Sequence, residues 1–357
     1  MPTSKERILA AVNHRLSDRV PLTFDAQPEV YDALYKHLGL TDAGAPRPTA
    51  KEDLFDRLHV DTWLIGPQRP APRPGEPERE RGGSIWGYRT RMVRYEGGEY
   101  PELVHSPLAG KDEIADIRAH PWPDADALDY SGFRAQAEAH RGRAVIGCFT
   151  WGAFFIGTHV RGTEHLLLDF ALRRDYAETL INTIAERSLA YLDRLLEAGG
   201  DSLDIVYMAD DYCSQRAPLF SPADFRHFVM PYLARAAGRV HARGKKFLLH
   251  CCGSVRPLMP MLIEAGVDVL EPIQTRAAGM DPAGLKRDFG RDICFYGGVD
   301  LQEVLRGPRQ GVVDEVKRLI DVLGQGGGYI LGPGHTYIQV DAPLENIFAM
   351  YDVAVTY

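Results

Sequence analysis

The sequence predicts a single (β/α)8 barrel of the TIM type, because short apolar runs alternate with longer helical segments along its 357 residues. Strands that alternate with helices form parallel sheets, and eight such strands close into a barrel. The eight expected strands are Val20–Phe24, Val60–Ile65, Ala144–Phe149, Asp204–Met208, Lys246–His250, Val267–Glu271, Ile293–Gly297 and Gly328–Leu331.

The helical segments are clearest in the second half of the chain. Each of them ends at a glycine, at positions 244, 266, 290 and 324, and glycine is the expected left-handed stop of a helix. The four helices expected there are Pro222–Arg243, Val255–Ala265, Pro282–Phe289 and Val312–Leu323. The N-terminal residues 1–15 also predict an amphipathic helix, with Ser4 as its N-cap.

Residues 67–107 interrupt this alternation with a loop rich in Pro, Gly and Arg, followed by two β-rich segments. Ser84–Tyr95 and Glu99–Val104 are joined by Glu96-Gly97-Gly98, which favours a β-hairpin. We expect an excursion from one barrel domain, residues 1–357, and no second domain.

Composition excludes several classes of function. The net charge is −8, and no stretch concentrates Lys and Arg among aromatic residues, which argues against a nucleic-acid surface. No run approaches the ~18 apolar residues of a membrane span, and no secretory signal is visible. Five cysteines without disulfide-scaffold spacing predict a reducing cytoplasm, with Cys148 and Cys294 in the core.

The active site of such a barrel is built from the loops at the carboxyl ends of its strands. His250 and Cys252 end the fifth expected strand, and residues two apart on a strand point to the same side. Gly253 allows a sharp turn after them. By the same alternation, Cys251 should point away and be structural.

His335 follows the last expected strand and can complete a three-ligand site with His250 and Cys252. Two imidazoles and one thiolate suit zinc, and an open fourth position describes a catalytic zinc site. The alternative is that His250 binds substrate through hydrogen bonds and Cys252 is a packed thiol.

Acidic residues at two further strand ends are candidate catalytic groups. Asp210 and Asp211 are adjacent, so only one can point into the barrel. That carboxylate could orient a metal-bound histidine, bind substrate, act as an acid or base, or cap a helix. Glu271 lies in an apolar run and must be paired if it is buried. We expect Asp210 and Glu271 to be catalytic and Asp211 to bind substrate.

Three more residues are candidates for substrate binding. Trp151 follows the third expected strand, where it could line a pocket or belong to the core. Gln274 follows the sixth strand, and Asp300 follows the seventh, where it could instead cap the next helix.

Three segments carry a resemblance to a known family: GKKFLLHCCGSVRPLMPMLIEAGVDVLEPIQ, ICFYGGVDLQEVL and GGGYILGPGH. They resemble the uroporphyrinogen decarboxylase superfamily, over most of the chain and most strongly from Asp204 onward. The resemblance implies a (β/α)8 barrel. The superfamily contains porphyrinogen decarboxylases and zinc-dependent methyltransferases linked to corrinoids.

Two differences from the motifs of the superfamily bear on which of its branches this chain resembles. The decarboxylases carry an N-terminal Met-Arg-Gln-Ala-Gly-Arg-Tyr pattern whose arginines hold the substrate's carboxylates, and residues 19–28 here read RVPLTFDAQP. The methyltransferases have a His-x-Cys motif where His250 and Cys252 stand, and a later Cys ligand after a Pro-Gly turn. His335 takes the place of that Cys here.

The resemblance therefore implies a zinc methyltransferase that exchanges a methyl group between a small molecule and a corrinoid carried on a partner protein. A decarboxylase or lyase acting on a carboxylated small molecule or tetrapyrrole is the second hypothesis. A non-enzymatic barrel that binds a corrinoid or tetrapyrrole is the third.

Overall fold

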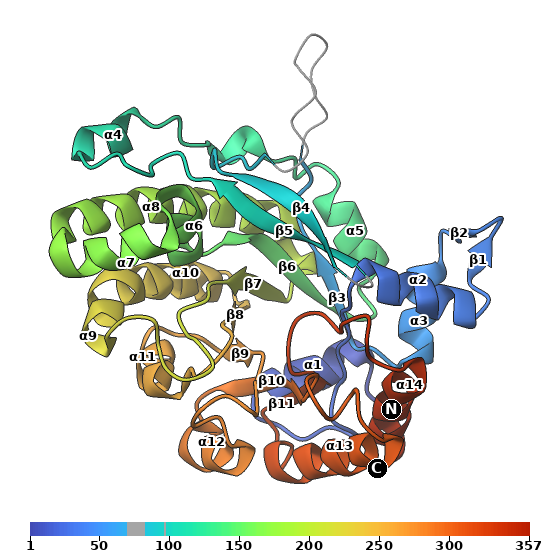
Figure 1. Cartoon of the computed structure of the whole chain (residues 1–357). Helices are drawn as coiled ribbons and strands as arrows, with labels where there is room; N and C mark the ends of the chain where they lie inside the picture. The colour runs from blue at the N-terminus through green and yellow to red at the C-terminus, as the bar shows by residue number, and fades with distance from the viewer. Residues whose placement is uncertain (70–82, 96–97) are drawn as a thin grey trace.

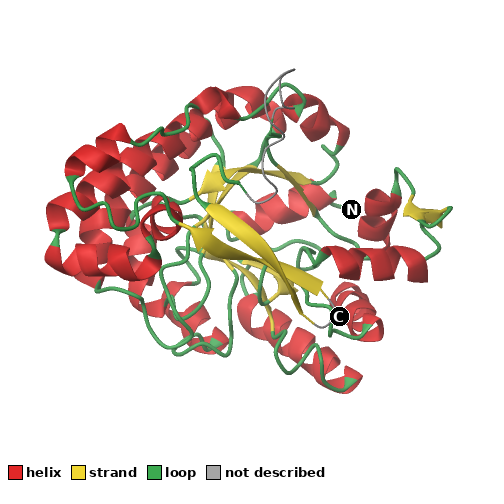
Figure 2. Ribbon diagram, turned by 45° about the horizontal axis from the view of Figure 1, so that its top comes forward, coloured by secondary structure: helices red, strands yellow, loops and turns green. Residues whose placement is uncertain are grey.

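A computed structural model describes residues 1–69, 83–95 and 98–357, and its centre is a curled sheet of seven parallel strands (Figure 1). The strand order is β11-β10-β9-β8-β7-β6-β3. The strands are β3 (Thr62–Ile65), β6 (Ala144–Trp151), β7 (Ile205–Ala209), β8 (Lys246–His250), β9 (Val269–Glu271), β10 (Cys294–Val299) and β11 (Tyr329–Pro333). Helices surround this sheet (Figure 2), so the predicted barrel fold is confirmed.

The first predicted strand, Val20–Phe24, is wrong as a regular strand, although its backbone bonds to both edges of the sheet. Thr23 N donates to Leu331 O at 3.0 Å and Leu331 N donates to Pro21 O at 2.9 Å. On the other side Asp61 N donates to Leu22 O at 2.8 Å. Pro21 has no N–H to extend the ladder. The segment therefore closes the gap between the first and last strands without forming a full ladder.

The helices occupy nearly every predicted position. They are α1 (Ser4–Val12), α2 (Pro28–His37), α3 (Ala50–Arg57), α4 (Ile114–Ala119), α5 (Phe133–Ala139), α6 (Ala153–Arg161), α7 (Thr163–Leu172), α8 (Arg174–Gly199), α9 (Pro222–Asp224), α10 (Met230–Ala242), α11 (Met259–Glu264), α12 (Pro282–Phe289), α13 (Arg309–Leu323) and α14 (Leu344–Thr356). Short 3-10 turns are η1 (Ala125–Ala127), η2 (Gly200–Ser202) and η4 (Arg256–Leu258).

Two helix predictions need correction. The segment predicted as one helix over Pro222–Arg243 contains a π-helical turn, η3 (Phe225–Val229), between α9 and α10. Pro231 in the first turn of α10 has no N–H for the regular ladder, which accounts for the irregular turn. At the N-terminus Thr3, and not Ser4, is the N-cap, in a capping box with Glu6.

The predicted hairpin is present as β4 (Arg89–Tyr95) and β5 (Gly98–His105), which pair antiparallel. Its predicted turn includes Glu96 and Gly97, which lie outside the described residues, as do residues 70–82 of the predicted loop. A further two-stranded ribbon is formed by β1 (Thr41–Asp42) and β2 (Ala45–Pro46).

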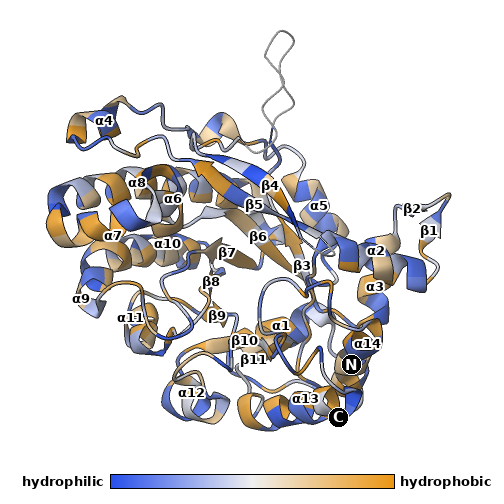
Figure 3. Ribbon diagram, in the orientation of Figure 1, coloured by the Kyte–Doolittle hydropathy of each residue, from blue (hydrophilic) through white to orange (hydrophobic). Residues whose placement is uncertain are grey.

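Helix α1 closes the amino end of the barrel. Lys5 of this helix contacts Asp204 before β7 at 2.8 Å, and its N–H donates to Gly142 O before β6 at 3.3 Å. Ile8 and Val12 are buried with inward strand residues such as Ile146 and Leu248. Figure 3 shows the strands of the central sheet largely in hydrophobic colours, whereas β4 and the outer helix faces are more hydrophilic. The carboxyl ends of the strands, opposite α1, remain for the site.

Within the described part of the chain, no helix combines the length and apolar character that a membrane span requires.

Candidate metal centre

Three potential metal ligands meet at the carboxyl ends of β7 and β8. Asp211 follows β7, His250 ends β8 and Cys252 lies two residues later. One ligand atom from each lies within 4.8 Å of the other two. His250 Nε2 is 3.4 Å from Cys252 Sγ and 3.6 Å from Asp211 Oδ1. These separations are close to the roughly 3.5 Å expected between ligands of a tetrahedral zinc ion.

The other ring nitrogen of His250 is held by a carboxylate. His250 pairs with Glu271 in the β8–β9 register, and its Nδ1 contacts Glu271 Oε2. Thr336 Oγ1 lies 3.1 Å from His250 Nδ1 and 3.4 Å from Glu271 Oε1. Burial alone would lower the pKa of His250, but the Glu271 carboxylate raises that pKa well above its usual value. Nε2 is therefore the nitrogen directed at Cys252 and Asp211.

The turn after His250 requires a glycine. Gly253 has φ +90°, and a Cβ there would lie 2.4 Å from Ser214 O of the neighbouring loop. Ser254 N donates to the same oxygen at 2.8 Å, so the two ligand-bearing loops interlock. Asp211 Oδ1 also accepts from Cys252 N at 2.8 Å, which ties Asp211 to the turn. Local backbone contacts thus preorganise two of the three ligands.

Cys251 faces away from this group, as strand alternation predicts. It is fully buried, and its Sγ accepts from Tyr212 N at 3.4 Å. Cys294 is also buried, and Cys148 is half-buried with a pKa raised to about 12 by burial.

His335 was predicted to be the third metal ligand, but it does not belong to the compact ligand group. Asp211 is the third residue of that group. Its ring centroid lies 6.3 Å from that of His250, and its Nδ1 accepts from Tyr337 N at 3.3 Å. Thr336, the next residue, reaches His250 and Glu271 instead. The loop after β11 places Thr336, and not His335, at the centre of this arrangement.

Asp210 caps a helix in this structure. Its carboxylate is fully buried and accepts from Phe155 N at 2.6 Å, Phe154 N at 3.2 Å and the Tyr212 hydroxyl at 2.9 Å. Burial raises the pKa of Asp210 to about 7, although these hydrogen bonds act to lower that pKa. Its contacts correspond to the capping alternative and not to the catalytic role expected of it.

The ligand set fits a zinc ion. One imidazole, one thiolate and one carboxylate are all zinc ligands, and three protein ligands leave a position for substrate. The carboxylate of Glu271 behind His250 is the arrangement that orients metal-bound histidines. Burial raises the pKa of the Cys252 thiol, and the neighbouring His250 opposes that rise.

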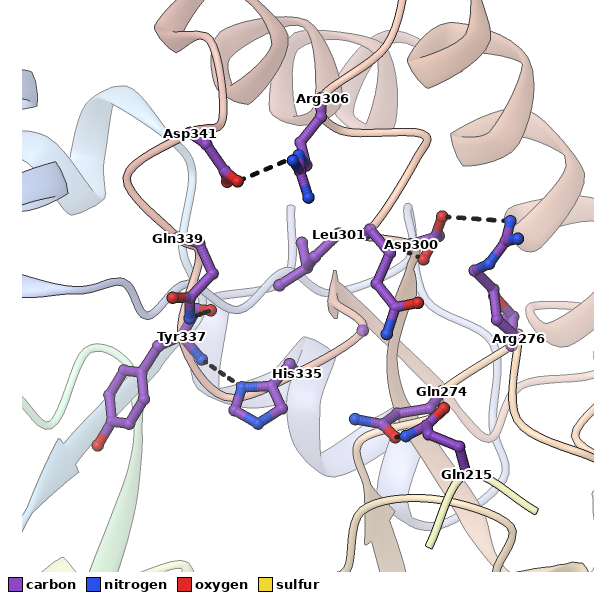
Figure 4. A pocket seen from close by; sticks show the side chains of 13 residues that line it. Gln215, Gln274, Arg276, Asp300, Leu301, Arg306, His335, Tyr337, Gln339 and Asp341 are labelled. Carbon is purple, nitrogen blue, oxygen red and sulfur yellow. Dashed lines mark hydrogen bonds and ion pairs between the residues drawn. The ribbon is translucent and has the colours of Figure 1, made fainter. Parts of the chain in front are cut away.

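Two cavities flank this group. The outer cavity, of about 220 Å³, is lined mainly by polar side chains, among them Gln274, Asp300 and His335 (Figure 4). The inner cavity, of about 90 Å³, is lined by Glu271 and Thr336 on the metal side and by Asp25, Tyr31 and Lys51 among others.

The predicted substrate-binding residues are divided between different places. Gln274 accepts from Gly253 N at 2.9 Å and lines the outer cavity. Asp300 lines it too, although its carboxylate caps a turn by accepting from the N–H groups of residues 302–304. Trp151 is stacked on Phe155 with centroids 4.0 Å apart, is 42% exposed, and lines neither cavity.

Sequence reasoning missed Asp25 and Lys51. Asp25 comes directly after the first predicted strand, so the strand-end rule could have found it. Lys51 lies on α3, with its Nζ 5.3 Å from the Phe55 ring centroid and 5.0 Å from that of Trp63. No sequence pattern indicated that this helix reaches the inner cavity.

We expect Asp25 to make stability depend on pH. Burial raises its pKa to about 6, so the folded protein keeps a proton that the unfolded chain releases near 4. Stability from this carboxyl group is therefore greatest below pH 4 and is lost as the pH rises to about 6. Asp25→Asn should gain roughly 2 kcal/mol relative to the wild type between pH 4.5 and pH 8. Urea unfolding at both pH values measures this gain, and parallel pH profiles would contradict it.

Comparison with known proteins gives a family match. The family model described as uroporphyrinogen decarboxylase (URO-D) matches residues 92–357. A methyltransferase from Methanosarcina mazei has the same fold, with a TM-score of 0.71 and 20% identity over 100% of this chain and 99% of the other.

Individual relatives fall in two groups. The methylcobamide:CoM methyltransferase of Methanosarcina barkeri is 29% identical over 181 residues, 50% of this chain and 48% of the relative. The uroporphyrinogen decarboxylase of Anaeromyxobacter sp. is 24% identical over 262 residues, 71% of each chain. The match to the methyltransferase thus spans about half the length of that relative.

Proposed function

The chain belongs to the uroporphyrinogen decarboxylase family, and from this premise we propose that it is a zinc-dependent methyltransferase of a corrinoid-linked system. The observation that carries the proposal is the group formed by Asp211, His250 and Cys252, with Glu271 behind the histidine. In this group a half-buried thiol and a buried imidazole converge with a carboxylate. Imidazole, thiolate and carboxylate are each ligands that zinc takes in catalytic sites.

The protein's own residues would supply the geometry of the reaction. His250 would present Nε2 because Glu271 holds Nδ1, and Cys252 would provide the thiolate. Asp211 is held toward the same point by Cys252 N. When bound, zinc supplies Lewis acidity that lowers the pKa of a substrate thiol or hydroxyl group.

The two cavities suit two reactants. The inner cavity is small, and its lining includes Phe24, Phe55 and tyrosines, which suits a small acceptor or donor. The outer cavity lies on the polar side of the mouth, where a corrinoid held by a separate protein would approach. Methyl transfer from a corrinoid to a substrate thiolate would form a C–S bond, break the Co–C bond and leave the electron pair on cobalt.

A direct test is methyl transfer from free methylcobalamin to a small thiol such as 2-mercaptoethanol. We expect demethylation of the corrinoid, followed by its absorbance, that depends on added zinc and on Cys252. Zinc-independent turnover would contradict the proposal.

Glu271→Gln should weaken metal binding without removing a ligand. The amide oxygen is an uncharged and weaker acceptor for the Nδ1–H of His250 than the carboxylate is. Weakening such a partner lowers metal affinity, by about 10- to 100-fold where the partner is lost. Competition with a zinc chelator measures the change. Thr275→Ser, a conservative change in the loop after β9, is the control and should bind zinc as the wild type does. Unchanged affinity in Glu271→Gln would contradict this role.

The alternative function is decarboxylation of a carboxylated small molecule or tetrapyrrole, which the match to a uroporphyrinogen decarboxylase favours. Against it, Lys51 is the only Lys or Arg among the described residues that line the inner cavity. Arg276 and Arg306 line the outer cavity, but they already pair with Glu303 and Asp341. A substrate with many carboxylates needs more cations. We expect no useful conversion of uroporphyrinogen to coproporphyrinogen in an anaerobic assay. A robust yield would favour the alternative.

A further inference from the structure

His335 occupies the boundary between the two cavities. Among the described lining residues, it is the one that borders both the inner and the outer cavity. Figure 4 shows its ring on the cavity wall, with Tyr337 on one side and Gln274 on the other. The side chain of His335 therefore faces any group that is transferred between reactants in the two cavities, whether or not His335 binds a metal ion.

Hydrogen bonding defines which ring nitrogen of His335 can act. The backbone N–H of Tyr337 donates to Nδ1 at 3.3 Å, so Nδ1 offers its lone pair to that bond. A neutral imidazole with an acceptor at Nδ1 carries its proton on Nε2. Nε2 is then a donor and has no free lone pair for a metal ion.

The backbone on both sides of His335 is anchored, which keeps the ring in place. Gly334 N donates to Val299 O at 2.7 Å, and a Cβ on Gly334 would lie 2.8 Å from the same oxygen. Thr336 is held by His250 and Glu271. The ring stands perpendicular to that of His250, at a centroid distance of 6.3 Å. His335 therefore lies beside the ligand group without belonging to it.

We infer that His335 donates a hydrogen bond from Nε2 to the thiolate or alkoxide of the substrate, and does not bind the metal. The inference rests on the proposed function and assigns a role to the histidine that stands where the resemblance implies a cysteine ligand. A donor at this position stabilises the deprotonated form of the substrate over its neutral form. It would also orient the nucleophile toward the outer cavity, where the methyl group arrives.

The test replaces zinc with cobalt(II) and uses 2-mercaptoethanol as the probe. His335→Phe keeps an aromatic ring and removes the donor, whereas His335→Gln keeps an N–H near the position of Nε2. The cobalt content and the ligand-field bands report the metal site. The thiolate-to-cobalt charge-transfer band, titrated with thiol across a pH series, reports the affinity for thiolate.

We expect His335→Phe to bind cobalt as the wild type does but to bind the thiol about tenfold more weakly, the loss of one hydrogen bond to a charged acceptor. The pH midpoint of thiolate binding should move upward by about one unit. His335→Gln should recover most of both.

Three outcomes would overturn the inference. Loss of cobalt from His335→Phe would make His335 a ligand. If His335→Phe kept the thiol affinity and the pH midpoint of the wild type, His335 would have no role in binding the substrate. Absence of cobalt bands in the wild type would overturn the proposed function together with the inference, whereas the first two outcomes leave that function standing.

Discussion

Purified protein is expected to carry about one zinc ion per chain, and Cys252→Ser is expected to lose nearly all of it. Cys252 supplies the only thiolate of the ligand group, which otherwise holds His250 and Asp211. A serine oxygen in its place is a poor zinc ligand at neutral pH because it stays protonated, and two remaining ligands do not hold zinc tightly. Elemental analysis after gel filtration measures the metal content of each protein.

Cys251→Ser is the matched control. Cys251 is the neighbouring residue, but its sulfur lies beside Tyr212 N and faces away from the ligand group. It should keep its zinc while losing some stability, because a buried thiol is replaced by a hydroxyl group. Equal loss of zinc from both variants, or full occupancy in Cys252→Ser, would show that the metal is elsewhere or absent.

Gly152→Ala should destabilise the fold strongly, because the added methyl group would collide with the side chain of Asp210, the residue before Asp211. A Cβ at Gly152 would lie 2.1 Å from Asp210 Oδ2 and 2.3 Å from its Cγ. The Asp210 side chain cannot move aside without losing three hydrogen bonds, from Phe154 N, Phe155 N and the Tyr212 hydroxyl. We expect a loss of about 2–4 kcal/mol in the free energy of unfolding, measured by urea denaturation.

Gly238→Ala provides the comparison for this effect. Gly238 lies within α10, and apart from its chain neighbours and the backbone of its own helix no atom lies within 4 Å of the Cβ that alanine would add. Alanine in a helix interior is favoured over glycine by roughly 0.5–1 kcal/mol, so this variant should be equally or more stable. If Gly152→Ala were as stable as Gly238→Ala, the packing described around Asp210 would be wrong.

The periodicity of the sequence predicted most of the helices and strands. It also predicted that two of the three residues of the ligand group, His250 and Cys252, lie on the same side. β8 begins and ends where the apolar run Lys246–His250 does, and α12 matches Pro282–Phe289. Both patterns are local, because a buried parallel strand is apolar throughout and α12 ends at Gly290. The left-handed conformation expected of the helix-ending glycines is found at Gly244 and Gly266 but is wrong for Gly290 and Gly324, whose φ angles are −67° and −75°. The convergence of His250 and Cys252 was equally readable, since it follows from alternation along one strand.

Pairings between distant segments could not be predicted in this way. Val20–Phe24 has the composition of a strand, but its ladder depends on where Pro21 meets Leu331 across the closing gap of the barrel. Likewise, the continuous helix predicted from residue 222 is interrupted by the π-helical turn Phe225–Val229, which precedes Pro231 in the first turn of α10.

By itself the sequence determined the strand-and-helix order and the same-side placement of His250 and Cys252. The tertiary structure alone decided which residue completes the group. Asp210 and Asp211 are equivalent in sequence, and the N-terminus of α6 takes the first carboxylate while Cys252 N takes the second. His335 and Thr336 are likewise neighbours, and the anchoring of Gly334 on Val299 brings Thr336 to Glu271. Side-chain direction in a loop depends on contacts with other loops, and those contacts have no local signature in the chain.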